Sequence, residues 1–269
     1  MKYRRLSGWF PVFINVLNMT NFLFKSCHKN GKINIVYTGS NFMNCNIIKR
    51  ILSRLFRDRL CLPLLVTLAL NSITYNVSRV WTGGRFHFDF TTAVDRAIPV
   101  LPWTTLIYLA SFLFWIINYT IGIMQNSDKA YHFLSSDIFA KFCCLIIFTL
   151  LPTTNIRPEI TGTGIFDKLL MFVYSVDAAD NLLPSIHCLT SHFCCIAVRK
   201  NDSIPMWYKV FSHIFAVMIY ISTLTTRQHV LVDVIAGVLL AEIAYHLTAR
   251  TGFADFYKRI YDKGRERNV

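Results

Sequence analysis

Three short polar segments lie beside apolar segments and carry side chains suited to phosphate chemistry. They read Asn-Ile-Arg-Pro at residues 155–158, Pro-Ser-Ile-His at 184–187, and Arg-Gln-His at 227–229, the last followed by Asp233. A membrane tolerates ionisable groups only where they face protein or water, so such groups beside membrane segments indicate function. Residues four apart lie on one face of a helix. We therefore expect the His229 ring and the Asp233 carboxylate to be in contact.

The second and third segments contain the groups that phosphoryl transfer needs. The reaction requires donors or cations around the phosphate oxygens, a nucleophile in line with the leaving oxygen, and an acid that protonates that oxygen. Asp233 can accept a hydrogen bond from one ring nitrogen of His229, which fixes the tautomer and leaves the other nitrogen as a nucleophile. His187 can donate the proton. We predict His229, Asp233 and His187 as catalytic residues.

Phosphate binding is predicted for the first two segments. The planar guanidinium of Arg157 matches a phosphate bidentately through charge-assisted hydrogen bonds. Pro184 suits the first turn of a helix, where its missing N–H group would have no partner anyway. The N–H groups of Ser185, Ile186 and His187 would then be free at a helix N-terminus, which binds anions. Ser185 can add its hydroxyl group as a donor.

The composition is typical of a membrane protein. Hydrophobic residues make up 54% of the 269 residues, above the share in an ordinary soluble domain. Polar residues do not interrupt them at the regular intervals that are typical of a soluble domain. The formal net charge is +13, but no nucleic-acid-binding motif accompanies it, so we expect no nucleic-acid partner. The eight cysteines lack zinc-site spacing, and the acidic residues near the polar segments do not cluster as an oxygen cage. We predict neither a metal nor a cofactor.

Six segments are candidates for membrane helices, which need about 20 mostly apolar residues. The third contains Asp137 and Lys141, and the fourth contains His187 and His192, so these two would face the inside of a bundle. His192 then either supports His187 or is structural. We therefore predict an all-α, polytopic membrane protein with a six-transmembrane-helix bundle. The segments are residues 60–80, 99–124, 133–151, 184–198, 206–224 and 229–249.

Lysine and arginine residues gather before the first apolar segment and after the last, which predicts cytoplasmic termini. Six crossings would place the three polar segments together on the external face of a multi-pass protein, and we expect the plasma membrane. The chain divides into a basic N-terminal extension at 1–59, a six-helix membrane domain at 60–250 with its catalytic motifs at 150–240, and a basic cytoplasmic tail at 251–269. Within the extension, apolar residues at helical spacing indicate either an interfacial helix or a segment packed against the bundle.

The three segments resemble the motifs of the type 2 phosphatidic acid phosphatase (PAP2) superfamily, which run Lys-x6-Arg-Pro, Pro-Ser-x-His and Ser-Arg-x5-His-x3-Asp. The resemblance covers roughly the last half of the chain and implies a PAP2-like bundle. It also implies that His229 forms a phosphohistidine, that Asp233 orients it and that His187 protonates the leaving alcohol. The matching positions are Arg157 and Pro158 for the first motif, residues 184–187 for the second, and Ser222, His229 and Asp233 for the third.

Two motif cations are missing from this sequence. The lysine of the first motif would fall at Leu150, and the arginine of the third at Thr223. Arg227 and Lys168 are candidate replacements as phosphate-binding residues, although Arg227 equally fits a residue at the membrane interface. With these two changes, the motif pattern is similar to that of the branch that includes inositol phosphorylceramide synthases. Members of this branch pass a phosphorylated head group to an alcohol.

The sequence therefore predicts an integral-membrane enzyme that acts on lipid or polyprenyl phosphates in contact with membrane lipids. The reaction would be phosphoric ester hydrolysis or phosphotransfer through a phosphohistidine, and the alternative is inositolphosphotransferase-type transfer of a head group to a lipid alcohol. A second alternative is a non-catalytic transporter or lipid-binding bundle that uses His229 and Asp233 as a proton relay. Inverted repeats would favour a transporter, and the sequence contains no visible internal repeat.

Overall fold

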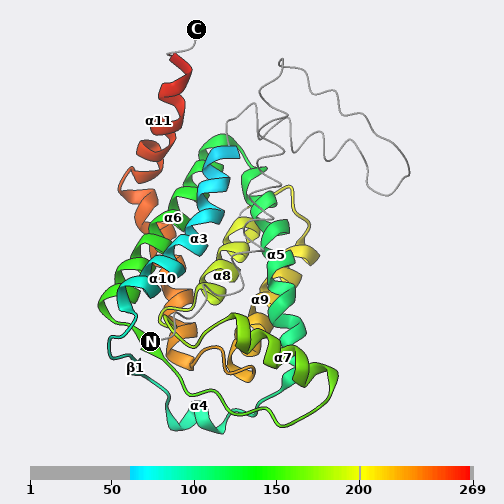
Figure 1. Cartoon of the computed structure of the whole chain (residues 1–269). Helices are drawn as coiled ribbons and strands as arrows, with labels where there is room; N and C mark the ends of the chain where they lie inside the picture. Colours follow the sequence, from blue (N-terminus) through cyan, green and yellow to red (C-terminus); the bar gives the residue numbers. More distant parts are fainter. Residues whose placement is uncertain (1–60, 200, 267–269) are drawn as a thin grey trace, which may run out of the picture.

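A computed structural model describes residues 61–199 and 201–266 of the chain (Figure 1). The described part is mostly helical, in agreement with the predicted all-α class, and its one sheet is a parallel pair of two-residue strands. These strands are β1 (Phe88–Asp89) and β2 (Thr153–Thr154). The N-terminal extension predicted at 1–59, including its interfacial helix, lies outside the described residues.

Six long helices occupy the six segments predicted from hydropathy. Some of the predicted ends are displaced. The third helix begins at Ser127 because the side chain of Asn126 accepts a hydrogen bond from the amide of Lys129, which caps that end. The sixth begins at Leu231, so His229 precedes it. The helices are α3 (Cys61–Thr82), α5 (Thr105–Ile123), α6 (Ser127–Leu150), α8 (Ile186–Arg199), α9 (Met206–Thr225) and α10 (Leu231–Arg250).

Four of the described helical segments are long and apolar enough to cross a membrane, which supports a membrane protein. They are Pro102–Ile123, Ser127–Leu150, Met206–Thr225 and Leu231–Arg250. The predicted count of six spans is not confirmed, because α3 and α8 are not among these four. With 14 residues, α8 is about 21 Å long, shorter than the roughly 30 Å hydrocarbon core of a bilayer.

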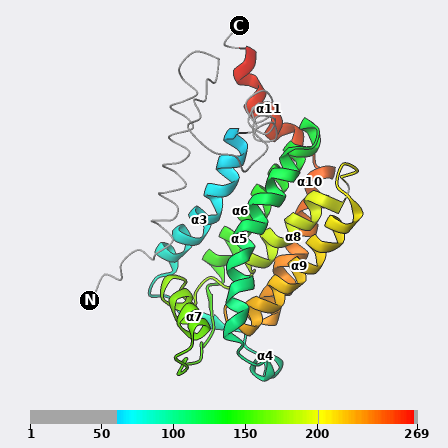
Figure 2. The same ribbon diagram turned by 90° about the vertical axis from the view of Figure 1, so that its right-hand side faces the viewer.

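Helix α8 lies at the centre of the bundle, packed against α5, α6, α9 and α10 (Figures 1 and 2). All its residues from Cys188 to Val198 are buried except His192. Its surroundings explain the weak hydropathy of this segment, because polar side chains on α8 face other helices. Trp115 of α5, for example, donates a hydrogen bond of 2.8 Å to the Ser191 hydroxyl.

The chain runs up and down, so that α3, α6 and α9 end where α5, α8 and α10 begin. The loops at this end also carry short helices, which are α4 (Ala93–Ala97), the 3-10 helix η1 (Pro102–Thr104) and α7 (Ile165–Val176). Figures 1 and 2 show α4 and α7 together at this end and α11 (Phe253–Glu266) at the opposite end. The three polar segments therefore belong to one end of the bundle.

Helix α11 falls within the segment predicted as a basic tail at 251–269. It packs against α6, where Phe253 lies 5.8 Å from the ring of Phe139 and Tyr257 is buried. Lys258 donates a hydrogen bond of 2.6 Å to Asp128. The tail is thus attached to the bundle by both apolar and ionic contacts.

Candidate functional site

His229 lies just before α10 and Asp233 lies in its first turn, and their side chains approach each other. The distance between His229 Nδ1 and Asp233 Oδ2 is 3.4 Å. The same carboxylate oxygen accepts a hydrogen bond of 3.0 Å from the Val230 amide, which fixes the carboxylate at the helix N-terminus. The amide of His229 is bonded to the Thr223 carbonyl at 3.1 Å. Although His229 lies before the helix, its backbone and ring are both held in place.

His187 lies in the first turn of α8, next to His229. The two ring centroids are 6.1 Å apart. Three aromatic rings of α5 surround His187, with Tyr108 stacked at 4.4 Å, Trp115 at 5.2 Å and Phe112 at 6.0 Å. Nε2 of His187 is buried and has no hydrogen-bond partner among the described residues. Because buried polar atoms in proteins almost always have a partner, this nitrogen is available to a ligand.

Ser185 connects the two histidine segments through its backbone. Its amide donates a hydrogen bond of 3.0 Å to the Asp233 carbonyl, and its hydroxyl oxygen accepts one of 3.3 Å from the Cys188 amide. The expectation of a free Ser185 amide in the first turn was therefore wrong, because α8 begins at Ile186 and Ser185 caps it. Of the three amides expected to bind phosphate, those of Ile186 and His187 remain in the first turn of α8, where an N–H group has no acceptor within the helix.

Gly237 allows the close approach of α10 to this capping residue. A Cβ atom at position 237 would lie 2.5 Å from the Ser185 carbonyl oxygen and 3.2 Å from the Leu189 amide. Both are backbone atoms, so they cannot turn aside as a side chain could. The absence of a side chain at Gly237 thus sets the separation of the two helices that carry His187 and Asp233.

Arg157 joins the first polar segment to the third. Its guanidinium donates hydrogen bonds to the Asp177 carbonyl and, at 2.6 Å, to Oε1 of Gln228, next to His229. The guanidinium also lies over the Tyr174 ring, 4.7 Å from its centroid. Its Nε atom is buried without a partner among the described residues. Arg157 is therefore fixed beside the histidine pair and retains an unused donor.

Asn155 adds a second link, because its amide group donates a hydrogen bond of 3.1 Å to the Arg227 carbonyl. Together with the bond between the Ser185 amide and Asp233, these contacts confirm that the three polar segments converge.

Arg227 does not join this group through its side chain. Its guanidinium donates hydrogen bonds to three backbone carbonyls of the α4 segment, those of Asp95, Arg96 and Ile98. The Asp95 carboxylate in turn accepts a bond of 2.7 Å from the Leu231 amide. Burial opposes ionisation of Asp95, but hydrogen bonds from Thr92 and Leu231 outweigh it and lower the pKa of its carboxyl. Arg227 thus clamps α4 to the start of α10.

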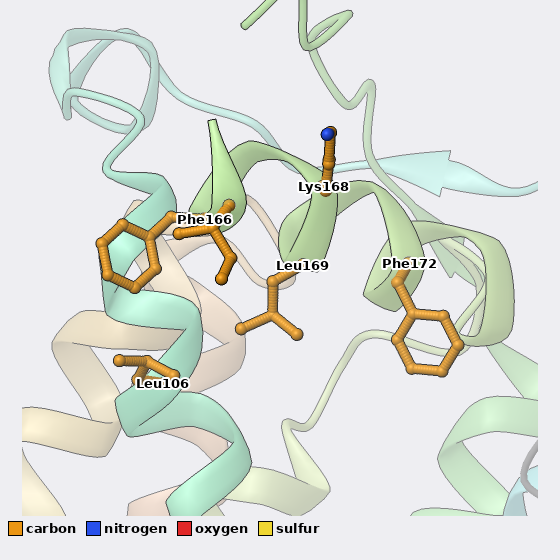
Figure 3. A pocket seen from close by; sticks show the side chains of 6 residues that line it. Leu106, Phe166, Lys168, Leu169 and Phe172 are labelled. Atoms are coloured by element: carbon orange, nitrogen blue, oxygen red, sulfur yellow. The ribbon is translucent and has the colours of Figure 1, made fainter. Parts of the chain in front are cut away.

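Lys168, the other candidate replacement cation, is an exposed residue of α7. It lines a groove with apolar residues of α5 and α7, and neither candidate histidine belongs to this lining (Figure 3). The structure therefore brings together His229, Asp233, His187, Ser185 and Arg157, but neither Arg227 nor Lys168.

His192 has partners of its own on the other side of α8. Its Nε2 lies 2.7 Å from Oε1 of Glu242 and its Nδ1 lies 3.0 Å from the Tyr220 hydroxyl. Arg199 also pairs with Glu242, through bonds of 2.5 and 3.0 Å. These contacts favour the structural alternative for His192.

Asp177 and Tyr108 were missed from the sequence. The Tyr108 hydroxyl donates a hydrogen bond of 2.9 Å to Oδ2 of Asp177, while the Tyr108 ring stacks on His187. Tyr75 donates to Oδ1 of Asp177 at 3.1 Å and to Asp180 at 2.9 Å. The signal in the sequence was a pair of acidic residues just before the Pro-Ser-x-His segment, in a chain that contains few acidic residues.

Comparison with known proteins agrees with this geometry. The PAP2 superfamily matches residues 82–247, a range that contains all three polar segments. No curated protein and no solved structure shows a significant match to the chain. The family match covers more than half of the chain and includes every residue of the convergent group. The chain belongs to the PAP2 superfamily, and this membership indicates phosphatase or phosphotransferase-type activity on lipid phosphates.

Proposed function

We propose that this protein cleaves a lipid or polyprenyl phosphate through a phosphohistidine on His229 and passes the phosphoryl group to water or to an alcohol. The observation that carries the proposal is the pair of His229 and Asp233, 3.4 Å apart, with the ring of His187 beside it. A carboxylate that accepts from Nδ1 holds a histidine in the tautomer whose Nε2 carries a lone pair. Nε2 of His229 is then the nucleophile.

His187 is proposed as the acid that protonates the leaving oxygen. Hydrogen-bond reach is about 2.6–3.2 Å, so a ring separation of 6.1 Å lets one phosphoryl group contact both histidines. As Nε2 of His229 attacks phosphorus, the bond from phosphorus to the alcohol oxygen breaks, and His187 supplies the proton that this oxygen needs. The aromatic rings around His187 exclude water from the proton donor.

Arg157 and the start of α8 are proposed to hold the phosphate oxygens. The free Nε donor of Arg157 and the first-turn amides of Ile186 and His187 all carry positive charge or partial charge. Such fixed donors stabilise the charge that develops on the phosphoryl oxygens in the transition state. Ser185 adds its hydroxyl proton, because its oxygen already accepts the Cys188 amide.

Hydrolysis and transfer differ only in the hydroxyl group that attacks the phosphohistidine. In either case the nitrogen–phosphorus bond breaks, the new oxygen–phosphorus bond forms, and His187 takes the proton of the attacking hydroxyl. The missing motif cations favour the alternative of inositolphosphotransferase-type transfer to a lipid alcohol, by similarity to the inositol phosphorylceramide synthase branch. The basic ends of the chain favour an external site in a plasma-membrane protein with cytoplasmic termini.

A panel of labelled lipids tests the proposal and separates its forms. Purified full-length protein in detergent is incubated with phosphatidic acid, farnesyl phosphate or phosphatidylinositol, each with and without ceramide as the acceptor alcohol. The label is on the phosphate. Release of labelled phosphate, or of labelled inositol phosphate from phosphatidylinositol, identifies a hydrolase, and label in a new lipid identifies a transferase. No turnover of any of these lipids, by protein that folds normally, favours the transporter or lipid-binding alternative, in which His229 and Asp233 carry protons across the membrane.

A further inference from the structure

A groove of about 380 Å³ lies between the start of α5 and one side of α7 (Figure 3). It is lined almost entirely by apolar side chains, and one cationic residue borders it. Its lining consists of Leu106 from α5 and Ile165, Phe166, Lys168, Leu169 and Phe172 from α7. This chemistry suits an apolar chain attached to an anionic head group.

Helix α7 carries apolar and charged side chains on different sides, as a helix at a membrane surface does. Leu170 and Val173 are fully buried against the protein, whereas Phe166 is 40% and Phe172 is 58% exposed. Figure 3 shows Phe166, Leu169 and Phe172 on the side of α7 from which α5 descends, and Lys168 on the opposite side. A helix with this separation lies at the boundary between acyl chains and head groups.

The groove is continuous with a helix that can cross the membrane. Leu106 is 51% exposed and lies in the first turn of α5, within the apolar segment Pro102–Ile123. In a bilayer crossed by α5, the open side of the groove would face the acyl chains and Lys168 would reach the head groups.

The same helix also reaches the candidate site. Tyr174 of α7 donates a hydrogen bond of 2.8 Å to the Thr226 carbonyl and lies under the guanidinium of Arg157. Lys168 and Tyr174 are six positions apart, which corresponds to about 9 Å along the helix axis. A lipid with its phosphate beside Arg157 thus has its first chain carbons within reach of the groove.

We propose that this groove binds the apolar chain of the lipid phosphate and that Lys168 attracts its anionic head group toward the site. The inference rests on the proposed function, because it assigns the substrate's chain to a place beside that site. It gives Lys168 a role in lipid capture from the membrane surface in place of direct phosphate binding. The proposed occupant is the substrate and not an ordinary bilayer lipid, because α7, which lines the groove, also contacts Arg157 through Tyr174.

Photochemical labelling tests binding without any requirement for turnover. Full-length protein in phosphatidylcholine vesicles receives a trace of phosphatidic acid, farnesyl phosphate or phosphatidylcholine, each with a diazirine in its chain. We expect one of the two lipid phosphates to label residues 165–172 at least fivefold more than phosphatidylcholine does. Excess unlabelled lipid phosphate should remove this label, and His229→Ala should keep it. Equal labelling by all three lipids would show a contact with bulk lipid and overturn the proposal, as would absence of label from the groove.

His229 does not line the groove, so His229→Ala leaves the lining unchanged. The labelling result is therefore independent of the test of the catalytic proposal. If a lipid phosphate labels the groove but the wild-type protein forms no phosphoenzyme, the proposal for the groove is supported and the phosphohistidine mechanism is contradicted.

Kinetics on two substrates give a second measure. Leu169→Ser should lower the ratio of kcat/KM for a long-chain lipid phosphate to that for a short-chain ester by about tenfold, because apolar contact with the chain is lost. Leu169→Trp, which fills the groove, should lower the same ratio even if the serine variant folds poorly. The control is Leu113→Ser, at a 63% exposed position of α5 outside the groove, which should keep the ratio. An unchanged ratio in both Leu169 variants contradicts the proposal.

Discussion

The substitution Gly237→Ala tests whether the close approach of α8 and α10 sets the geometry of the histidines. The added Cβ would lie 2.5 Å from the Ser185 carbonyl oxygen, where about 3.4 Å is the lower end of ordinary contact. The two backbones must therefore separate by nearly 1 Å. This movement lengthens the bond between the Ser185 amide and the Asp233 carbonyl, now 3.0 Å, and it displaces His187 from His229.

The expected effect on stability is small and the expected effect on activity is large. Overpacking costs about 1–3 kcal/mol, while replacing glycine by alanine within a helix returns about 1 kcal/mol. The free energy of unfolding should thus fall by about 0–2 kcal/mol. A misplacement of 1 Å at a reacting centre can cost on the order of 10²-fold in rate, so kcat should fall by about that factor.

Gly122→Ala provides a matched control. A Cβ atom at Gly122 of α5 would lie 2.8 Å from the Phe133 ring, which is also a tight contact, but Gly122 lies near the end of α5 remote from the candidate site. Both variants are compared by denaturant unfolding in detergent and by turnover of the lipid phosphate identified in the panel. Activity of Gly237→Ala that equals the activity of Gly122→Ala would show that the close approach of α8 and α10 does not set the geometry of the histidines.

Three further predictions concern the histidine acid, the arginine clamp and the orientation of the chain. His187→Ala should lower turnover of a lipid ester by about 10²- to 10⁴-fold, but much less with p-nitrophenyl phosphate, whose leaving group needs no proton; equal losses on both substrates would remove the acid role. Arg227→Ala should reduce the free energy of unfolding by about 1.5–3 kcal/mol through lost charged hydrogen bonds; unchanged stability combined with a large rise in KM would instead make Arg227 a phosphate ligand. On a background without native cysteines, Thr163→Cys should react with an impermeant maleimide in intact cells and Ser203→Cys should not, and the reverse pattern would place the site on the cytoplasmic side.

Features set by local sequence patterns could be predicted, and features set by distant contacts could not. The long apolar segments identified the positions of all six long helices, because hydropathy over about 20 residues is a local property. The contact between His229 and Asp233 also follows from a local spacing. The two side chains are in contact although α10 begins two residues after His229, because the Asp233 carboxylate points back toward the Val230 amide and accepts its hydrogen bond.

The role of Arg227 could not be predicted, because its partners lie about 130 residues earlier in the chain. The Ser185 amide presents the same difficulty, since its acceptor at Asp233 belongs to another helix. Helix α7 was missed because its 12 residues are too few for a membrane helix, and hydropathy was the property that defined the expected elements. Lys168 was consequently predicted as a phosphate-binding residue without its helix, whereas it is part of an amphipathic helix beside a groove.

Trapping of the phosphoenzyme tests whether His229 is the nucleophile. Full-length protein is incubated with substrate carrying labelled phosphate, quenched, and examined for covalent label. We expect label that is lost in acid and retained in base, and that is absent from His229→Ala. The label should persist in the control His213→Ala, whose ring bonds to the Lys209 carbonyl of its own helix. Label that persists in His229→Ala would show that the nucleophile is a different residue.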